Sequence, residues 1–459
     1  MKNLKILIIV MSLILVTPQI TFAKKQKDST DNHIEYMNLS WWENFNDPQL
    51  SEYLVQVYKN NPDLKIASIK AQQSQQIMKQ AFANQLPQLY FNGTLQRELT
   101  GSTQQFGDVI IPDYNQAHYI LPLTMSYEVD IWGENYLKTK SMKKQIEMTK
   151  QDERATYISI SSSFASNYYT LIGIDKLIKN QEKLLTLEKE IVKLEEQKYQ
   201  SGLCPVAEVL SEKQTLAQMQ ERYNTLKERQ DIVINQLISQ LGDRYNKEIT
   251  RSEYSSISEI KTPNDISTEF IGERPDIKKA EFYIEKTGID VKVAQRDFLP
   301  KFRIYGQVGF NAYDWCRMFA PHTFLSTVGV MPSLDLFTGG MKKAKLKYNK
   351  LEYEKALQIY QKSILTSIQE LNDSMMSIKT SQMNYENSKE RYLLELEKLA
   401  LSNNQFKIGG KAMLDNLKDQ EISIMIEEGV VTNNINRLLS AINLYKAVGG
   451  KDYTKQQNL

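Results

Sequence analysis

Asn61-Pro62-Asp63-Leu64 has a counterpart in Arg274-Pro275-Asp276-Ile277, which lies 213 residues later in the same chain. Further pairs of landmarks follow in the same order at offsets of 205 to 213 residues. They are Leu86-Pro87 with Leu299-Pro300, Val129-Asp130-Ile131-Trp132 with Leu334-Asp335-Leu336-Phe337, Tyr199 and Gly202 with Phe406 and Gly409, and Leu241-Gly242 with Val448-Gly449. Ordered matches at a nearly constant offset predict an internal repeat, in which each half of the chain builds the same structural unit.

Each unit begins with a polar helix and continues with two strands. The helix is expected over residues 48–85 in the first repeat and 273–298 in the second, because the Leu-Pro pair that follows prevents it from continuing. Alternating apolar and polar residues then predict a strand pair over 88–131 and a copy of it over 301–337. Such strands suit a barrel wall between lipid and water, although the strand pattern alone favours a two-layer sandwich.

The segments after the strands decide between these alternatives. Residues 134–201 contain one glycine and no proline, and residues 341–408 contain neither. At about 1.5 Å per residue, each segment can form a helix roughly 100 Å long, which ordinary globular domains do not use. In the second repeat, apolar residues at spacings of seven, four and three predict a coiled-coil seam. Glycine-containing turns lead to return helices over 206–242 and 411–449, so each repeat ends in a helical hairpin.

The first residues have the pattern of a cleavable secretory signal. Lys2 and Lys5 precede an apolar run at residues 6–16 and the small-residue site Thr21-Phe22-Ala23. The run is short for a membrane anchor, which is the alternative, and no later segment approaches the ~20 apolar residues of a spanning helix. The expected division is a signal peptide at 1–23, an N-terminal extended segment at 24–47, the first repeat at 48–242, a linker or equatorial segment at 243–272, the second repeat at 273–450 and a C-terminal tail at 451–459.

Composition and charge argue against several classes of function. The 57 Lys and Arg residues nearly balance the 55 Asp and Glu residues, so a formal charge of +2 predicts no nucleic-acid-binding face. The sequence has no phosphate-binding glycine loop, no Gly-x-Ser-x-Gly elbow and no His or Cys cluster. We therefore expect no enzyme activity, no cofactor and no metal site. Cys204 and Cys316 are expected to be free thiols.

Five motifs follow one another along residues 41–450. They are Trp41-Trp42-Glu43 with Phe45 and Asp47-Pro48, Asn61-Pro62-Asp63-Leu64, Tyr127-Glu128-Val129-Asp130-Ile131-Trp132-Gly133, Arg274-Pro275-Asp276-Ile277 with Ala280-Glu281, and Leu336-Phe337-Thr338-Gly339-Gly340. Together they resemble the TolC-like outer-membrane efflux family, in the branch that serves resistance-nodulation-division pumps. The order of the motifs is far more specific than any one of them.

The resemblance implies a mostly α fold with a small β part. Each chain of a homotrimer gives four strands to a twelve-stranded outer-membrane β-barrel, which continues as a long periplasmic α-helical barrel of coiled-coil hairpins. It implies a passive exit duct for drugs or other toxic small molecules in a tripartite efflux system. The partners are a periplasmic adaptor (membrane fusion) protein, an inner-membrane pump of the resistance-nodulation-division type and outer-membrane lipid. Many members of this branch carry a lipid-modified cysteine, but none lies near Ala23, so we expect no lipid anchor.

Two other functions fit parts of the pattern. The outer-membrane channel of a type I protein or peptide secretion system is one alternative. A secreted coiled-coil adhesin or structural protein is the second, and it would explain the helices but not the strand pairs that interrupt them at matching positions.

The resemblance also assigns residues to parts of the channel. The periplasmic gate is expected at the second hairpin tip, where Leu414 forms an apolar constriction and Lys418 stands where we expect an acidic residue. The expected residues are Leu414, Asp415, Lys418 and Asp419 for the gate, Tyr199, Gly202, Phe406, Gly409 and Gly410 for the adaptor-contact tips, and Trp132 and Phe337 for the membrane-interface aromatics. The alternatives are a solvated helix face, hairpin capping and core burial, respectively. For Arg274 we favour a helix-start partner of Asp276 over a pore charge.

Overall fold

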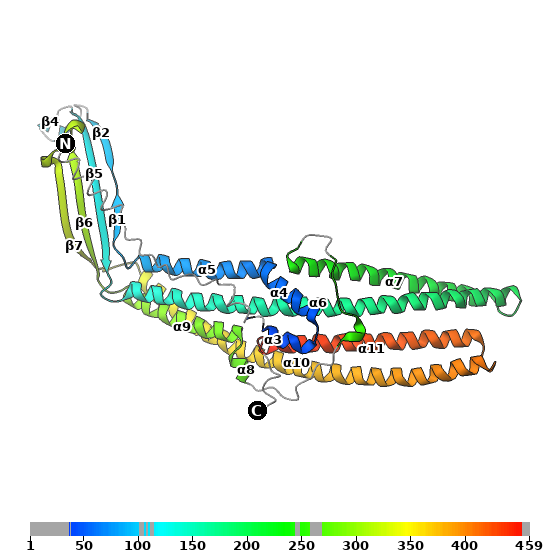
Figure 1. The fold of residues 1–459 in the computed structure, drawn as a ribbon. Helices are drawn as coiled ribbons and strands as arrows, with labels where there is room; N and C mark the ends of the chain where they lie inside the picture. Colours follow the sequence, from blue (N-terminus) through cyan, green and yellow to red (C-terminus); the bar gives the residue numbers. More distant parts are fainter. Residues whose placement is uncertain are drawn as a thin grey trace. The chain divides into compact units, whose positions relative to one another are not determined.

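The computed structural model describes residue 36 and residues 38–100, 105–106, 109–110, 114–243, 248–257 and 269–451 (Figure 1). The expected signal peptide at residues 1–23 lies outside the described residues. The chain forms two compact units, which we call the strand unit and the hairpin unit. The described residues of the strand unit come from Gln72–Glu147 and Phe282–Gln358, and those of the hairpin unit come from Thr30–Ala71, Met148–Glu281 and Ile359–Leu459.

The strand unit contains an antiparallel sheet to which both repeats contribute. β1 and β2 both pair with β5, β5 pairs with β6, and β6 pairs with β7, so the two repeats are joined directly through β5 and β6. A separate pair is formed by β3 and β4. The strands are β1 (Gln88–Phe91), β2 (Thr94–Thr100), β3 (Gln105–Phe106), β4 (Val109–Ile110), β5 (Tyr114–Val129), β6 (Lys301–Ala312) and β7 (Phe324–Ser333).

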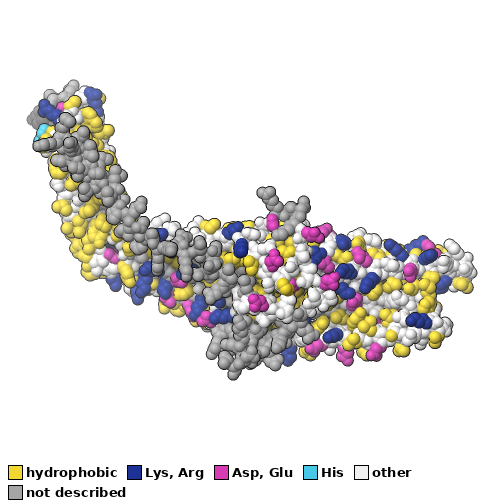
Figure 2. Space-filling model, in the orientation of Figure 1, with side chains coloured by type: hydrophobic (Ala, Val, Ile, Leu, Met, Phe, Trp, Pro, Cys, Tyr) yellow, Lys and Arg dark blue, Asp and Glu magenta, His cyan; other side chains and the backbone are white. Residues whose placement is uncertain are grey.

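The register places apolar side chains of neighbouring strands beside one another on one face of the sheet. Leu123 of β5 lies opposite Val308 of β6, and Ile304 of β6 lies opposite Val330 of β7. This face is open, since Val330 is 63% exposed and Val308 is 43% exposed. Figure 2 shows apolar side chains gathered over the strands. The sheet therefore differs from one layer of a sandwich, in which the apolar face is covered.

The other face of the sheet is polar. Gln307 of β6 lies between Thr124 of β5 and Thr327 of β7. Glu128 of β5 lies opposite Arg303 of β6, with 3.9 Å between Oε2 and Nη2. The alternation in the sequence is thus confirmed as two chemically different faces of a single sheet.

Long helices dominate the rest of the chain. Figure 1 shows α7 running back along α6 and α11 running back along α10, as two hairpins. Among the helices that the structure describes, none has both the length and the apolarity to cross a membrane. The helices are α3 (Leu39–Trp42), α4 (Pro48–Asn60), α5 (Pro62–Ala83), α6 (Glu134–Gln200), α7 (Val206–Leu241), α8 (Glu269–Gly272), α9 (Pro275–Arg296), α10 (Met341–Lys407) and α11 (Met413–Ala447), with 3-10 turns at Glu43–Phe45, Tyr254–Ser256, Trp315–Arg317 and Pro321–Thr323.

The opening helix of the first repeat, expected as one helix over residues 48–85, is two helices. α4 ends and α5 begins on either side of Asn61, whose ψ of 126° is the extended conformation that a following proline favours. The Oδ1 atom of Asn61 accepts hydrogen bonds from N of Asp63 at 2.9 Å and N of Leu64 at 3.1 Å, so it caps α5. The expectation of one continuous helix is therefore wrong, because Pro62 starts a new helix.

An aromatic cluster in the hairpin unit holds the segment before the first repeat against both hairpins. Trp41 and Trp42 are buried, and Trp41 stacks on Tyr445 of α11 with 4.1 Å between ring centroids. Phe45 stacks on Tyr169 of α6 at 5.4 Å. Burying a side chain of this size contributes about 1.5–3 kcal/mol. The Trp41-Trp42 motif is therefore a core element.

One hydrogen bond in each repeat connects its beginning to its end, and we call these two bonds the repeat joints. Asn61 donates through Nδ2 to O of Gln240 near the end of α7, at 2.7 Å. Arg274 donates through Nη1 to O of Ala447 at the end of α11, at 2.8 Å. The donors are equivalent at the offset of 213 and the acceptors at 207, so the joints occupy the same place in each repeat. Each joint satisfies a carbonyl that a helix end leaves without an intrahelical partner.

We expect Asn61→Ala to lower the free energy of unfolding by about 1–3 kcal/mol, because it removes the cap of α5 and leaves O of Gln240 without its partner. Asn60→Ala is the matched control, since Asn60 is an exposed asparagine one residue earlier. Thermal melting followed by circular dichroism compares the two variants. Equal melting temperatures would contradict a structural role for the joint.

Candidate functional site

The tip of the first hairpin is closed by a glycine in a left-handed conformation. Gly202 has a φ of +73°, and its N–H donates to O of Tyr199 at 2.9 Å. The N–H of Leu203 donates to O of Lys198 at 2.9 Å. These two bonds form the Schellman arrangement that ends a helix. Tyr199 is 49% exposed and Leu203 is 75% exposed, so the tip presents apolar groups to its surroundings.

The tip of the second hairpin repeats this arrangement. Gly409 has a φ of +74° and donates to O of Phe406 at 3.1 Å, and Gly410 donates to O of Gln405 at 2.8 Å. Phe406 is 39% exposed and Ile408 is 83% exposed. At both tips the glycines serve as helix caps, whereas an exposed aromatic ring and an exposed aliphatic side chain are available for contact with another molecule.

The four expected gate residues lie near the start of α11 and differ in burial and in partners. Leu414 is half-buried and Asp415 is exposed. Lys418 and Asp419 face two different partners. Leu414 and Lys418 lie four residues apart on α11, as do Asp415 and Asp419, so each pair shares a face of the helix. The ion pairs are those of Lys418 and Asp419.

Lys418 and Asp419 are both neutralised within the chain. Nζ of Lys418 lies 2.7 Å from Oε1 of Glu212 on α7, and this carboxylate raises the pKa of Lys418. Burial alone would raise the pKa of Asp419, but the ammonium group of Lys411 bound to it lowers the pKa overall. Sequence reasoning missed Glu212, although the offset of 207 residues places it at the position equivalent to Asp419.

Four buried glutamates, which we call the seam glutamates, interrupt the apolar seams of the hairpins. Each has one carboxylate oxygen that is buried and accepts no hydrogen bond from any described residue. The two glutamates on each helix lie seven residues apart, which is the spacing of equivalent positions in a coiled coil. This spacing is the sequence signal that could have identified them. The seam glutamates are Glu188 and Glu195 on α6, and Glu421 and Glu428 on α11.

Glu188 forms a cluster with two other carboxyl groups beside Lys418, which we call the tip carboxyl cluster. Burial, followed by the charge of Glu421 on α11 and then that of Glu212 on α7, raises the pKa of Glu188 to about 8. Burial also raises the pKa of Glu421. Burial and the neighbouring carboxylates therefore favour the protonated form of Glu188. The cluster brings together side chains from three helices of the two hairpins.

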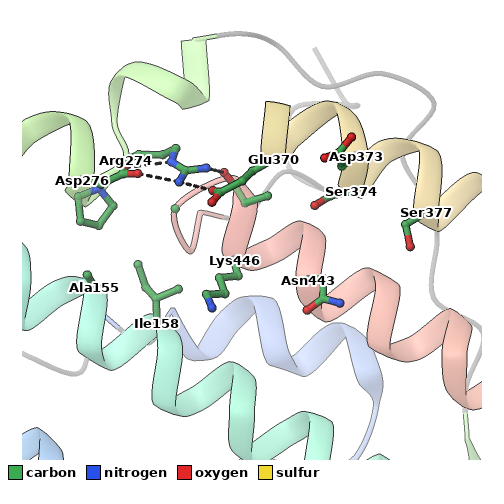
Figure 3. Close-up of a pocket in the computed structure, with 13 residues that line it drawn as sticks. Ala155, Ile158, Arg274, Asp276, Glu370, Asp373, Ser374, Ser377, Asn443 and Lys446 are labelled. Atoms are coloured by element: carbon green, nitrogen blue, oxygen red, sulfur yellow. Dashed lines mark hydrogen bonds and ion pairs between the residues drawn. The ribbon is translucent and has the colours of Figure 1, made fainter. Parts of the chain in front are cut away.

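Arg274 lies at a pocket of about 510 Å³ in the hairpin unit, shown in Figure 3. It is buried, and Nη2 lies 2.7 Å from Oδ2 of Asp276 and 2.6 Å from Oε2 of Glu370 on α10. Its Nη1 atom forms the second repeat joint. These bonds give the guanidinium group a structural role, which agrees with the helix-start role favoured from the sequence.

The two expected interface aromatics occupy equivalent positions just before α6 and α10, and both are exposed. Trp132 is 38% exposed, and its Nε1 atom donates to O of Pro300 at 2.7 Å. Phe337 is 90% exposed. Neither ring is buried in a core, which was the alternative expected from the sequence.

Comparison with known proteins connects this architecture to a family. The sequence pattern of the family described as outer membrane efflux protein matches residues 53–243 and 267–450, which is most of the chain. The toluene efflux pump outer membrane protein TtgC of Pseudomonas putida is 23% identical over 416 residues, covering 90% of this chain and 85% of the relative.

Two further proteins show the same likeness. The pyoverdine export outer membrane protein OpmQ of Pseudomonas aeruginosa is 23% identical over 424 residues, covering 91% of this chain and 89% of the relative. The Campylobacter jejuni CmeC outer membrane channel has a TM-score of 0.79 at 22% identity, with 92% of this chain and 91% of that chain covered. The expected fold class, a mostly helical TolC-like channel protein with a small β part, is confirmed by this structural likeness.

We expect Glu188→Gln to remove a loss of stability between about pH 4.5 and pH 8. The pKa of Glu188 is raised from 4.5 to about 8, so the stability that its protonated form contributes is fully present below pH 4.5 and is lost as the pH rises through about 8. At roughly 1.4 kcal/mol per pH unit, a shift of this size sets an upper bound of about 5 kcal/mol.

Melting temperatures of the purified protein across this pH range provide the measurement. The wild type should melt at lower temperature as the pH rises, and Glu188→Gln should show a smaller decline. Glu190→Gln, which changes an exposed glutamate on the same helix, should behave as the wild type does. An unchanged pH dependence in Glu188→Gln would show that the tip carboxyl cluster does not titrate as described.

Proposed function

Because the chain belongs to the outer membrane efflux protein family and is the outer-membrane channel component of an efflux system, we propose that it works as a homotrimer enclosing one passive exit duct. In this proposal, the duct receives drugs or other toxic small molecules from an inner-membrane pump through a periplasmic adaptor protein. The pump is of the resistance-nodulation-division type and supplies the energy. The chain itself catalyses no reaction.

The sheet of the strand unit is the observation that carries the proposal. Among the described strands, β7 pairs on one side only, with β6, and β1 and β2 pair on one side only, with β5. In hydrocarbon every backbone N–H and C=O group requires a partner, so an open sheet edge cannot face lipid. Joining β7 of one copy to β1 and β2 of the next pairs both edges. Because β1 and β2 lie along the same side of β5, they count as one strand position, and each copy has four positions with β5, β6 and β7. Three copies then form a twelve-stranded barrel that is apolar outside and polar inside.

The names of the relatives support small molecules as the cargo. TtgC is named for toluene efflux and OpmQ for pyoverdine export. We therefore favour efflux of small molecules over the protein cargo of a type I secretion system. The protein lies in the outer membrane, and in our proposal the hairpin unit extends into the periplasm. Export through a cleavable signal peptide at residues 1–23, without a lipid anchor, is part of the same proposal.

The hairpin tips are the proposed periplasmic end of the duct. Their exposed groups, Tyr199 and Leu203 on one tip and Phe406 and Ile408 on the other, are suited to contact with an adaptor. Leu414 and Asp415 line the constriction that closes the duct. The ion pair of Lys418 with Glu212 joins α11 to α7 in one copy. Opening that moves α11 relative to α7 would break this pair, whereas opening that moves the two helices together would keep it.

We expect Val328→Lys to prevent assembly of the channel in the membrane. Val328 is 79% exposed on the apolar face of β7, and a lysine facing lipid costs about 2–4 kcal/mol near the bilayer midplane. Thr327→Lys is the matched control, because Thr327 lies next to it on the polar face. Crosslinking in isolated outer membranes and ion conductance across a planar bilayer measure assembly.

The control variant should give conducting trimers, and Val328→Lys should give few or none. A wild-type protein that purifies as a monomer without conductance would contradict the proposed duct. Equal assembly of the two lysine variants would contradict the assignment of the apolar face to lipid.

We expect a reversible thiol crosslinker to block export when a cysteine replaces Asp415. The substitution introduces a thiol at an exposed position near the start of α11, and linking two copies there would prevent the tips from separating. Drug accumulation in cells of a deletion strain measures export, before and after a reductant cleaves the crosslink. Lys389→Cys is the control, because it places an exposed thiol in the middle of α10. Normal export by crosslinked Asp415→Cys trimers would refute gating at the tips.

A further inference from the structure

Three side chains with metal-binding atoms meet at the tip of the first hairpin. Glu195 lies near the end of α6, Cys204 in the turn and Glu208 in the first turn of α7. One carboxylate oxygen of each glutamate and Sγ of Cys204 all lie within 4.8 Å of one another. Ligand atoms around a tetrahedral zinc ion are separated by roughly 3–4 Å, given the usual bond lengths. Small side-chain rotations would therefore bring the three atoms to binding distance.

The carboxyl group of Glu195 supplies an independent indication of a ligand. Glu195 is 3% exposed, and its Oε1 atom accepts a hydrogen bond from Nζ of Lys198 at 2.9 Å. Its Oε2 atom is buried and accepts no hydrogen bond from any described residue. A buried polar atom without a partner costs about 1–3 kcal/mol, and more when it is charged. A cation bound beside Cys204 would supply the missing partner.

The charges at the tip balance when a divalent ion is present. Without a metal ion the Cys204 thiol donates to O of Glu195 at 3.5 Å, so binding of the ion releases this proton to solvent. The three groups then carry three negative charges. A divalent ion and the ammonium group of Lys198 together carry three positive charges. Lys198 can keep its bond to Oε1 of Glu195 while Oε2 binds the ion, so the ion and the lysine do not compete for the same atom.

From this geometry we propose that Glu195, Cys204 and Glu208 bind a divalent transition-metal ion such as Zn²⁺, with a water molecule as the fourth ligand. A thiolate among the ligands favours Zn²⁺ over Mg²⁺ and Ca²⁺, which prefer oxygen alone. The ion connects the end of α6, the turn and the start of α7. It therefore restrains the first tip, the same tip that the proposed function assigns to adaptor contact.

The sequence does not reveal this site, because its spacing matches none of the common metal-binding motifs. Glu195 lies nine residues before Cys204, and Glu208 lies four residues after it. Only the reversal of the chain at Gly202 brings α6 and α7 together and places both glutamates near the thiol. The expectation of no metal site rested on sequence spacing alone.

Cobalt binding to the purified full-length protein tests the proposal. Co²⁺ is added to metal-free protein in detergent with a non-chelating reductant, and absorption reports the charge-transfer band of a cobalt–thiolate bond. We expect one Co²⁺ per chain, a thiolate band and displacement by Zn²⁺. Cys204→Ser should remove the band. It should also weaken Co²⁺ binding by more than about 10–100-fold, because that is the usual loss when a residue that only supports a ligand is removed, and Cys204 is itself a ligand. Glu208→Gln should keep the band but weaken binding.

Cys316→Ser is the matched control, because Cys316 is the other free cysteine and lies in the strand unit. It should retain both the band and the affinity. Lys198→Gln should strengthen binding, since it removes a positive charge beside the ion. Circular dichroism establishes that each variant is folded. A wild-type protein without the thiolate band, or a band that persists in Cys204→Ser, would overturn the proposal. Because the readout is metal binding, its failure is separate from failure of trimer assembly or conductance.

Discussion

Packing along seams between long helices is the constraint on which the two hairpins depend. α10 is 67 residues long, and most of its side chains are exposed. A helix of this kind contacts its neighbours through about two positions in seven, so each seam position counts more than a position in a broad apolar core. α6 has the same length but is buried more extensively, because its middle part packs in the aromatic core. In the seams of α6 and α11 the seam glutamates occupy such positions. The hairpins are therefore held there by ion pairs and hydrogen bonds in addition to apolar contacts such as those of Leu184, Leu185 and Met219.

The presence of glutamates at seam positions has a physical consequence for the tips. Removing charged groups from water is costly, and their mutual attraction repays the cost only where the geometry is good. The tip carboxyl cluster has three acids and one nearby base, Lys418, so it is not neutralised by ion pairing alone. A buried polar group without a partner lowers stability. The tip carboxyl cluster therefore places incompletely satisfied polar groups on the side of the hairpins that leads to the proposed periplasmic end of the duct.

Much of the fold could be predicted because its signals are local and occur twice. Alternation along the strands predicted the two faces that the pairing of Leu123 with Val308 confirms. The break at Asn61 was missed although Pro62 signals it, because the repeat was read as one continuous helix. Contacts between distant residues could not be predicted. Lys418 and Glu212 are 206 residues apart, and helical periodicity tells which face a residue lies on but not which residue it meets. The same limit hid the partners of Glu188.

The repeat joints show how far the duplicated halves have diverged. In one half a neutral amide holds the carbonyl, and in the other a guanidinium does so while also binding Asp276 and Glu370. An asparagine at position 274 would leave two carboxylates without their cation. An arginine at position 61 would remove the cap of α5, and although Asp63 lies at the position equivalent to Asp276, Ser163 stands at the position that the offset of 207 residues makes equivalent to Glu370. The two halves are thus no longer interchangeable. In a chimaera that carries the same half twice, the residue at one repeat joint would not match its surrounding partners. The side chains at positions 61 and 274 therefore prevent a return to the exact symmetry of the original duplication.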